Sequence, residues 1–332
     1  MAFLVHWYHL LCLAVVVGAV AGSLWAIFRR SECGRHRDHD TKHESLLAAG
    51  DGSMTSYVGS CQLWMSRWRG VHPVFLLAFR LFAAVTMAAV LFWDIRTYDF
   101  SIMLYYTEWT FTLVIIYFLI ATSISAHGCW IYSKHVTEIE EADGFIKRDC
   151  EENMPAMNFG PKRNRKAIKL QRYYEQGENE QKAGFWGYIM QVTYQTSAGA
   201  VVLTDVVFWV LLVPFLSAEN FSLDLVMGCM HSLNLVFLVL DTALNSLPFP
   251  WFRMAYFVLW SCIYVIFQWV LHACGFSWWP YPFLELSTPW APLWYLSLAL
   301  VHFPCYGLYS LIAKVKITFF TKFFSHVCTR LC

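Results

Sequence analysis

The residues whose types and spacing suit chemistry lie in one apolar stretch, residues 225–249, with the sequence LVMGCMHSLNLVFLVLDTALNSLPF. Within it stand an imidazole, a carboxylate and two amides, from His231, Asn234, Asp241 and Asn245. Their separations of 3, 7 and 4 residues place them along one side of a helix. Polar groups in membrane helices usually face a bundle interior or a wet cavity. The stripe therefore predicts an intramembrane site with His231 at its chemical centre.

The composition is that of an integral membrane protein. Of the 332 residues, 58% are hydrophobic, 18% are aromatic and only 14% are charged. A soluble domain is about half apolar and about a quarter charged. The net charge of +1 gives no reason to expect a nucleic-acid partner. The 11 cysteines contain no CxxC pair and no zinc-finger spacing.

Seven apolar segments are long enough to cross a bilayer, because about 20 apolar residues span its hydrocarbon core. They are residues 5–28, 74–94, 108–130, 186–216, 225–249, 251–274 and 292–312. This pattern predicts an all-α bundle of seven helices, one N-terminal helix followed by a six-helix core. The expected divisions are an N-terminal helix at 1–28, a polar linker at 29–72, a core at 73–314 with a large loop at 131–185, and an interfacial tail at 315–332.

The basic residues predict the orientation of the bundle. In a seven-pass arrangement, 22 of the 24 Lys and Arg residues fall on one side, mostly in segments 29–72 and 131–185. Arg96 falls on the other side, and Arg80 lies within a span. Lys and Arg accumulate in cytosolic loops of membrane proteins. We therefore expect the N-terminus outside, in the lumenal or extracellular space, and the C-terminus in the cytosol.

A threonine and a histidine lie at similar depths below the outer surface in this orientation. At 1.5 Å per residue, Thr112 is about 6 Å deep and His231 about 9 Å deep. A threonine hydroxyl becomes nucleophilic when a nearby imidazole takes its proton. The pattern is thus compatible with a catalytic pair of Thr112 and His231. The alternative is that Thr112 bonds its own helix and His231 a neighbouring one.

Four further polar residues could orient the base or the substrate at this end. Glu108 precedes Thr112 by one helical turn, and Asn234 follows the candidate histidine by three residues. His272 lies at the outer end of its helix, and Glu285 lies in the outer loop.

A second pair of polar residues is expected near the cytosolic end. Arg80 and Asp241 each lie in the inner third of a predicted span. A single charge at that depth is costly. We therefore expect the two side chains to pair or to share a polar network in a structural role.

Two motifs of the chain resemble a known family. The run GCMHSLNLVFLVLDTAL is similar to the segment HGMHT-x-x-LPF-x-L-x-E of the androgen-induced membrane proteins, which are threonine hydrolases of fatty acid esters of hydroxy fatty acids. Met230 and His231 fall on the Met-His step of that segment. Residues 281–285, YPFLE, match a second family motif, and His272 matches a histidine before it. The resemblance implies a six-span core and a catalytic role for His231.

The family threonine occurs in the pattern W-K-[FY]-L-T at the start of a membrane helix. Here Thr112 follows Trp109 by three residues, so a one-residue gap is needed, and Thr110 follows it by two. Either threonine is a candidate nucleophile. The run YTEWTFTLVIIYFLIATSISAHGCW also resembles the rolling-stone-like proteins linked to cell fusion and a group of uncharacterised plant membrane proteins, to which the chain looks most similar.

These observations predict a multi-pass protein of the endoplasmic reticulum or plasma membrane that hydrolyses lipid esters. The alternative is a non-enzymatic membrane adaptor or cell-fusion-related protein. Membrane lipids are the expected partners, and loops 29–72 and 131–185 are candidate surfaces for protein partners. No cofactor and no metal is implied, although His36, His39 and His43 are clustered.

Overall fold

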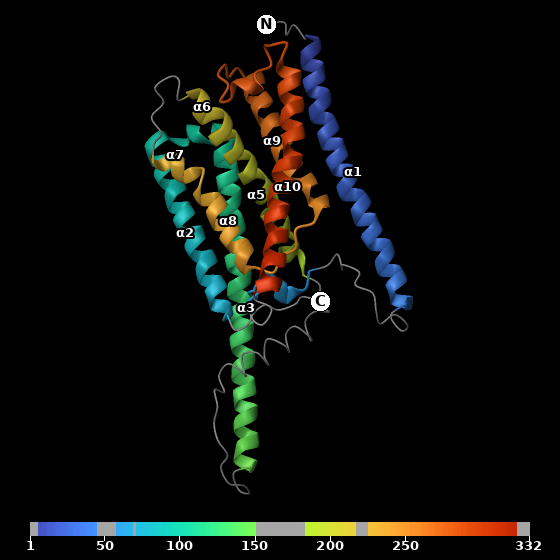
Figure 1. The fold of residues 1–332 in the computed structure, drawn as a ribbon, viewed down its shortest axis with the longest axis vertical. Coiled ribbons are helices and arrows are strands. Elements are labelled where there is room, and N and C mark those ends of the chain that lie inside the picture. Colours follow the sequence, from blue (N-terminus) through green and yellow to red (C-terminus); the bar gives the residue numbers. More distant parts are fainter. Residues whose placement is uncertain (1–5, 45–57, 69–70, 151–182, 217–224, 324–332) are drawn as a thin grey trace.

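The computed structural model describes residues 6–44, 58–68, 71–150, 183–216 and 225–323. Over these residues the chain is helical, with no β-strand. Seven helical units are long and apolar enough to cross a membrane. Figure 1 shows them side by side as a bundle. The prediction of an all-α, seven-span membrane protein is therefore confirmed.

The helices follow the predicted segments in order. Their bounds are α1 Trp7–Glu44, α2 Pro73–Tyr98, α3 Tyr106–Cys150, α5 Phe185–Val206, α6 Val213–Leu216, α7 Leu225–Met230, α8 Leu233–Leu244, α9 Met254–Ala273 and α10 Ala291–Phe323. A π-helical segment, Val207–Leu212, joins α5 to α6. Short 3-10 helices lie at Ser60–Leu63, Phe100–Leu104, Trp251–Arg253 and Pro282–Leu284.

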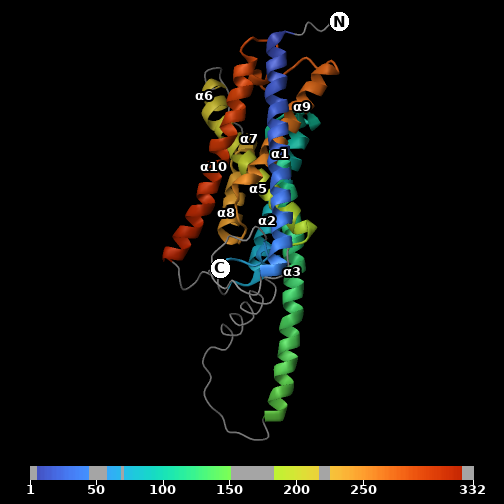
Figure 2. The same cartoon turned by 90° about the vertical axis from the view of Figure 1, so that its right-hand side faces the viewer.

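The bundle is built around α5. This helix contacts α3, α9 and α10, and α2 packs on the far side of α3. Helix α1 lies against α9 and α10 at one side of the bundle, as Figures 1 and 2 show. Its first turn is fastened to the loop before α10, where His9 Nε2 lies 3.0 Å from the carbonyl oxygen of Leu286.

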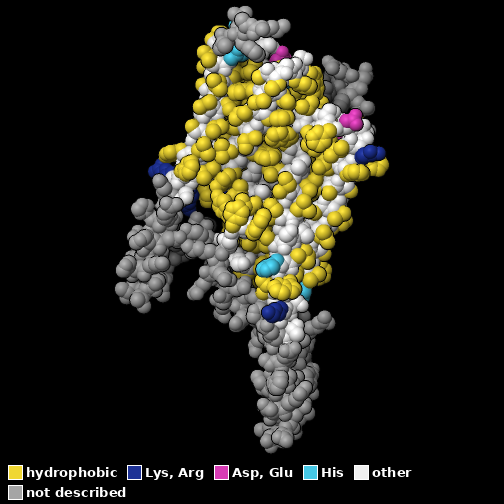
Figure 3. All heavy atoms as spheres, turned by 180° about the vertical axis from the view of Figure 1, so that it is seen from behind, with side chains coloured by type: hydrophobic (Ala, Val, Ile, Leu, Met, Phe, Trp, Pro, Cys, Tyr) yellow, Lys and Arg dark blue, Asp and Glu magenta, His cyan; other side chains and the backbone are white. Residues whose placement is uncertain are grey.

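The surface of the bundle is apolar where lipid would contact it. Figure 3 shows one face covered by hydrophobic side chains, with charged groups near its margins. Large side chains such as Phe82, Trp93 and Leu300 are more than half exposed. A soluble protein rarely exposes so large an apolar surface. The exposed surface thus agrees with the hydropathy of the helices.

The predicted polar linker, 29–72, differs from expectation at both ends. Helix α1 continues to Glu44, and residues 58–68 pack against α3. Trp64 is buried against Tyr132 and lies over Gly128, where a Cβ atom would approach the indole within 2.2 Å. This part of the linker is apolar enough to be buried. The side chains of His36, His39 and His43 lie outside the described part of the chain.

Two other helix ends also differ from those predicted from the sequence. Helix α3 continues to Cys150, so the first part of the predicted loop 131–185 is helical. The helix predicted for residues 225–249 ends at Leu244 rather than Phe249. Pro248 and Pro250 favour the earlier end, since proline disfavours the helical conformation in the residue before it and removes a backbone donor.

Candidate functional site

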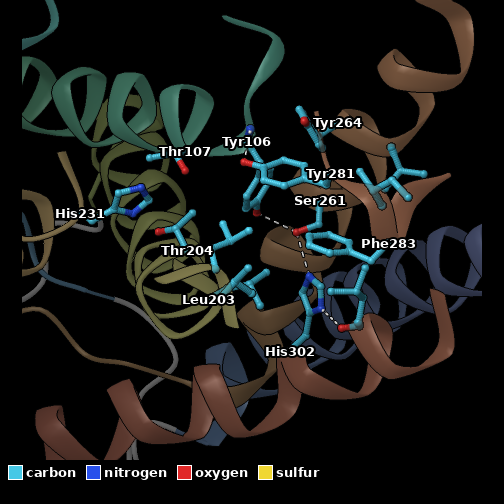
Figure 4. Close-up of a pocket in the computed structure, with 15 residues that line it drawn as sticks. Tyr106, Thr107, Leu203, Thr204, His231, Ser261, Tyr264, Tyr281, Phe283 and His302 are labelled. Carbon is cyan, nitrogen blue, oxygen red and sulfur yellow. Dashed lines mark hydrogen bonds between the residues drawn. The ribbon is translucent and has the colours of Figure 1, made fainter. Parts of the chain in front are cut away.

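A mostly apolar cavity, partly open to its surroundings, lies within the bundle. Ligand sites in proteins commonly combine apolar walls with a few placed polar groups. The walls here include Leu203, Val265 and Leu298. The polar side chains that line it are His231, Thr107, Thr204, Ser261, His302 and three tyrosines (Figure 4).

His231 lies at a break in the membrane helix that the sequence predicts to be continuous. Helix α7 ends at Met230 and α8 begins at Leu233. The Ser232 N–H donates to the carbonyl of Cys229, three residues back, at 3.2 Å, and the four-residue pattern resumes where Val236 N–H donates to Ser232. The tight turn places the imidazole, 7% exposed, in the cavity wall.

The imidazole is held flat by an aromatic ring from another helix. The His231 and Phe208 rings are stacked, with centroids 3.6 Å apart and planes 6° from parallel. Phe208 belongs to the π-helical segment, an uncommon conformation that occurs frequently at functional sites. Among the described residues, the buried Nδ1 of His231 has no hydrogen-bond partner. The ring is therefore positioned by stacking and retains a nitrogen without a protein partner.

Thr107, in the first turn of α3, shares the cavity with His231. Both side chains line the cavity, and Figure 4 draws them on the same side of it. Thr204 also lines this region, but its hydroxyl donates to the Val201 carbonyl at 2.8 Å, within its own helix. No hydrogen bond from the Thr107 hydroxyl to its own helix is found in the described chain, and its side chain interacts with Tyr281 instead.

Tyr281 connects the YPFLE motif to the start of α3. Its hydroxyl oxygen accepts the Tyr106 backbone N–H at 3.2 Å. Burial raises the pKa of Tyr281 to about 12, although hydrogen bonds from the Thr107 side chain and backbone favour the ionised form. Tyr281 is therefore a neutral phenol at pH 7 that holds the first turn of α3. The motif and the candidate threonine are distant in sequence and adjacent in the fold.

Thr112 and Thr110, the two threonines proposed from the sequence, do not line the cavity. Both hydroxyls are buried and lack a hydrogen-bond partner within the described structure. The helix begins at Tyr106, two residues before the expected start, so Thr107 occupies its first turn. Five residues separate Thr107 from Thr112, which turns the latter about 140° around the helix. The structure therefore brings Thr107, and not Thr112, to the histidine's cavity.

Two of the expected supporting residues, Glu108 and Asn234, are buried outside the cavity lining. Within the described regions, Glu108 Oε2 has no hydrogen-bond partner. Asn234 Oδ1 accepts the Leu235 N–H at 2.7 Å. Neither residue is in hydrogen-bond contact with His231.

The other two supporting residues, His272 and Glu285, stabilise the loop beyond α9. The His272 ring bonds the carbonyls of Gln268 at 2.7 Å and Trp278 at 3.1 Å, and it stacks on Trp279 with centroids 3.5 Å apart. Glu285 accepts a hydrogen bond from the hydroxyl of Ser287. These contacts indicate a structural role in shaping the loop that contains Tyr281.

The expected pairing of Arg80 with Asp241 is present. Arg80 Nε lies 2.9 Å from Asp241 Oδ1, and both side chains are fully buried. Tyr117 donates to the other carboxylate oxygen at 2.5 Å, and Asn245 Nδ2 donates to it at 2.7 Å. The guanidinium also donates to the Leu63 carbonyl at 2.9 Å. This network lies at the opposite end of the bundle from the cavity.

The cavity contains an imidazole–hydroxyl hydrogen bond that the sequence did not single out. His302 Nε2 and Ser261 Oγ are 2.8 Å apart, and Ser261 Oγ is 2.8 Å from the Tyr106 hydroxyl. His302 and Ser261 come from α10 and α9. The sequence does not indicate that His302 and Ser261 meet, since they are 41 residues apart.

Comparison with known proteins returned no match: no family model, no curated protein and no solved structure is similar to this chain. The fold and the site by themselves define the class, a multi-pass integral membrane protein with an apolar cavity inside its helical bundle.

Proposed function

We propose that this protein is an intramembrane hydrolase of lipid esters, with Thr107 as nucleophile and His231 as general base. One observation supports this most strongly. A single apolar cavity brings together the first turn of α3, the break between α7 and α8, and Tyr281 from the YPFLE motif.

The reaction follows from the two side chains. His231 takes the proton from the Thr107 hydroxyl as its oxygen attacks the ester carbonyl. The imidazolium then protonates the departing alkoxide, leaving an acyl group on Thr107. Water, deprotonated by the same ring, releases the fatty acid and regenerates the hydroxyl. Tyr281 acts as a positioning residue because it holds the turn that bears Thr107.

The walls of the cavity favour a lipid substrate. Leu203, Val265, Leu284 and Leu298 supply apolar surface suited to acyl chains. The bundle exposes its apolar sides where lipid would lie, so a lipid ester would collect in the bilayer around the protein.

The family resemblance at Met230-His231 and at YPFLE supports the same role for His231. The pattern W-K-[FY]-L-T can be placed on residues 103–107 without a gap, with Tyr105 at its aromatic position and Thr107 at its threonine. Met103, Leu104 and Tyr106 depart from the pattern at its other three positions. We propose on this basis that the chain belongs to the superfamily of the androgen-induced proteins. We also propose that its N-terminus is outside, which places the cavity in the outer half of the membrane.

The direct test is hydrolysis of a fatty acid ester of a hydroxy fatty acid by the purified protein in lipid nanodiscs. Release of free fatty acid, measured by mass spectrometry, is expected to fall by about 10²–10⁴-fold in His231→Ala, the range for loss of a general base. His127→Ala is the matched control, since His127 is exposed on α3 and outside the cavity. Equal turnover in wild type and His231→Ala would exclude this role and favour a non-enzymatic adaptor.

A further inference from the structure

The side of the cavity formed by α9 and α10 holds a chain of three hydrogen-bonded side chains. Figure 4 shows hydrogen bonds from Tyr106 to Ser261 and from Ser261 to His302. The imidazole of His302 is also hydrogen-bonded to a backbone carbonyl. His302 Nδ1 is 2.7 Å from the Leu298 carbonyl oxygen. Each of the three side chains belongs to a different helix, and all three line the cavity.

The direction of each hydrogen bond follows from the chemistry of its partners. The Leu298 carbonyl can only accept, so His302 Nδ1 must donate to it. In the neutral ring, Nε2 is then an acceptor, and the Ser261 hydroxyl donates its one proton to it. Tyr106 must therefore donate to Ser261 Oγ. The resulting order runs from phenol to serine to imidazole to carbonyl.

This order is the arrangement of a nucleophile, a base and a group that orients the base. A serine is activated when its proton is directed at the acceptor nitrogen of an imidazole whose other nitrogen is fixed. His302 is 6% exposed, and its ring lies 4.4 Å from the Phe257 ring, so its position is set by neighbouring side chains as well. Ser261 is only half-buried and faces the cavity.

We propose that Ser261 is a second nucleophile of the cavity, activated by His302, that accepts acyl groups from carboxylic esters. The Ser261 oxygen forms a bond with the carbonyl carbon while its proton passes to His302 Nε2. The bond from that carbon to the alcohol oxygen then breaks, and the alcohol leaves with the proton. Tyr106, which donates to Ser261 Oγ in the resting state, is placed to donate to the developing oxyanion.

The proposal is independent of the Thr107–His231 pair. It uses a different hydroxyl and a different imidazole, from α9 and α10. The competing interpretation is that Ser261 and His302 only join α9 to α10. Ser261 Oγ also lies 3.3 Å from the Phe257 carbonyl of its own helix, a longer contact than the one with His302.

A long-chain alkyl fluorophosphonate separates these interpretations. The serine oxygen attacks phosphorus, the P–F bond breaks, fluoride leaves, and His302 takes the proton. The full chain in nanodiscs would be treated with the probe, digested, and the adduct located by peptide mass spectrometry. We expect an adduct on Ser261, its loss in Ser261→Ala, and a labelling rate at least tenfold lower in His302→Gln. His127→Ala should label at the wild-type rate.

The location of the adduct keeps the two proposals distinct. An adduct on Thr107 would support Thr107 as the nucleophile of the Thr107–His231 hydrolase. An adduct on Ser261 would support Ser261 as a second nucleophile. Absence of a Ser261 adduct in the folded wild-type protein would overturn the proposal, whatever the behaviour of the variants. A Ser261 adduct that forms equally fast in His302→Gln would overturn the role of His302 as base.

Discussion

At the scale of single residues, the two cavity histidines differ in how they are held. His302 uses both ring nitrogens in hydrogen bonds. His231 is held by stacking on Phe208, and its Nδ1 has no partner within the described structure. A ring fixed by stacking retains nitrogens that can take a proton from a substrate or a neighbouring hydroxyl. This difference suits His231 to act as a base for Thr107 and His302 to activate Ser261.

Tyr281→Phe should lower ester turnover while leaving the fold intact. The change removes the hydroxyl that accepts the Tyr106 N–H at 3.2 Å, so the first turn of α3 and Thr107 lose an anchor. Small misplacements of a reacting group can cost up to about 100-fold in rate. We expect at least a tenfold fall in kcat with an unchanged melting temperature. Tyr256→Phe, outside the cavity, should retain activity, and equal rates for both variants would contradict the anchoring role.

Asp241→Asn should destabilise the protein. It leaves the Arg80 guanidinium buried without its counter-charge, and breaking a buried ion pair from one side costs about 3–5 kcal/mol. Thermal unfolding in detergent micelles should show a markedly lower Tm than wild type. The double variant Arg80→Met with Asp241→Asn should recover part of the loss. An unchanged Tm in the single variant would show that the pair is not needed for stability.

At the scale of elements, two irregular segments build the site. The helix break at 231–232 directs the imidazole inward, and the π-helical segment Val207–Leu212 supplies the ring that stacks on it. Hydropathy predicts the two spans that contain these segments, because apolar length decides that a helix crosses the membrane. No proline or glycine marks residues 231–232, so that break has no composition signal. Pro214 follows the π-helical segment by two residues, and its missing N–H donor is a sequence signal for the disturbed hydrogen bonding there.

Gly199→Ala should loosen the contact between α5 and α9. A Cβ atom at this position would approach Phe257 Cδ1 within 2.5 Å, so the ring would have to move. Phe257 packs on His302, and overpacking of a core typically costs about 1–3 kcal/mol. We expect a lower Tm and slower fluorophosphonate labelling of Ser261.

Gly18→Ala is the matched control for that experiment. Gly18 lies in α1, and a Cβ atom added there would meet no neighbouring atom within 4 Å. The same substitution should be neutral or slightly stabilising, because alanine favours a helix by about 1 kcal/mol over glycine. A Gly199→Ala protein as stable as the Gly18→Ala protein would contradict the close contact.

At the scale of the whole molecule, the bundle separates two kinds of polar site. The cavity lies at the end where α3 and the YPFLE loop begin, and the Arg80 network lies at the other end. Sequence reasoning anticipated this separation from the positions of His231 and Asp241. It considered Thr112 and Thr110 but not Thr107, which lines the cavity, because the start of α3, two residues earlier than expected, is not visible in hydropathy. Contacts such as Ser261–His302 require the relative rotation of two helices, which no local pattern specifies.

The orientation of the bundle leads to a further prediction. Because 22 of the 24 Lys and Arg residues fall on one side, an epitope tag inserted in segment 131–185 should be cytosolic. In cells permeabilised only at the plasma membrane, an antibody should reach this tag. An N-terminal tag should be reached either from outside intact cells or only after all membranes are opened. Access to the 131–185 tag from outside an intact cell would reverse the proposed topology.

In the proposed mechanism, Thr107 is the nucleophile and His231 activates it. The most direct test compares ester hydrolysis by Thr107→Ala and Thr112→Ala, which remove the same atoms from the same helix. Thr107 lines the cavity, whereas the Thr112 hydroxyl is buried away from it. We predict that Thr107→Ala loses at least about 100-fold in kcat and that Thr112→Ala stays within about threefold of wild type. Full activity in Thr107→Ala, or equal losses in both variants, would contradict the account.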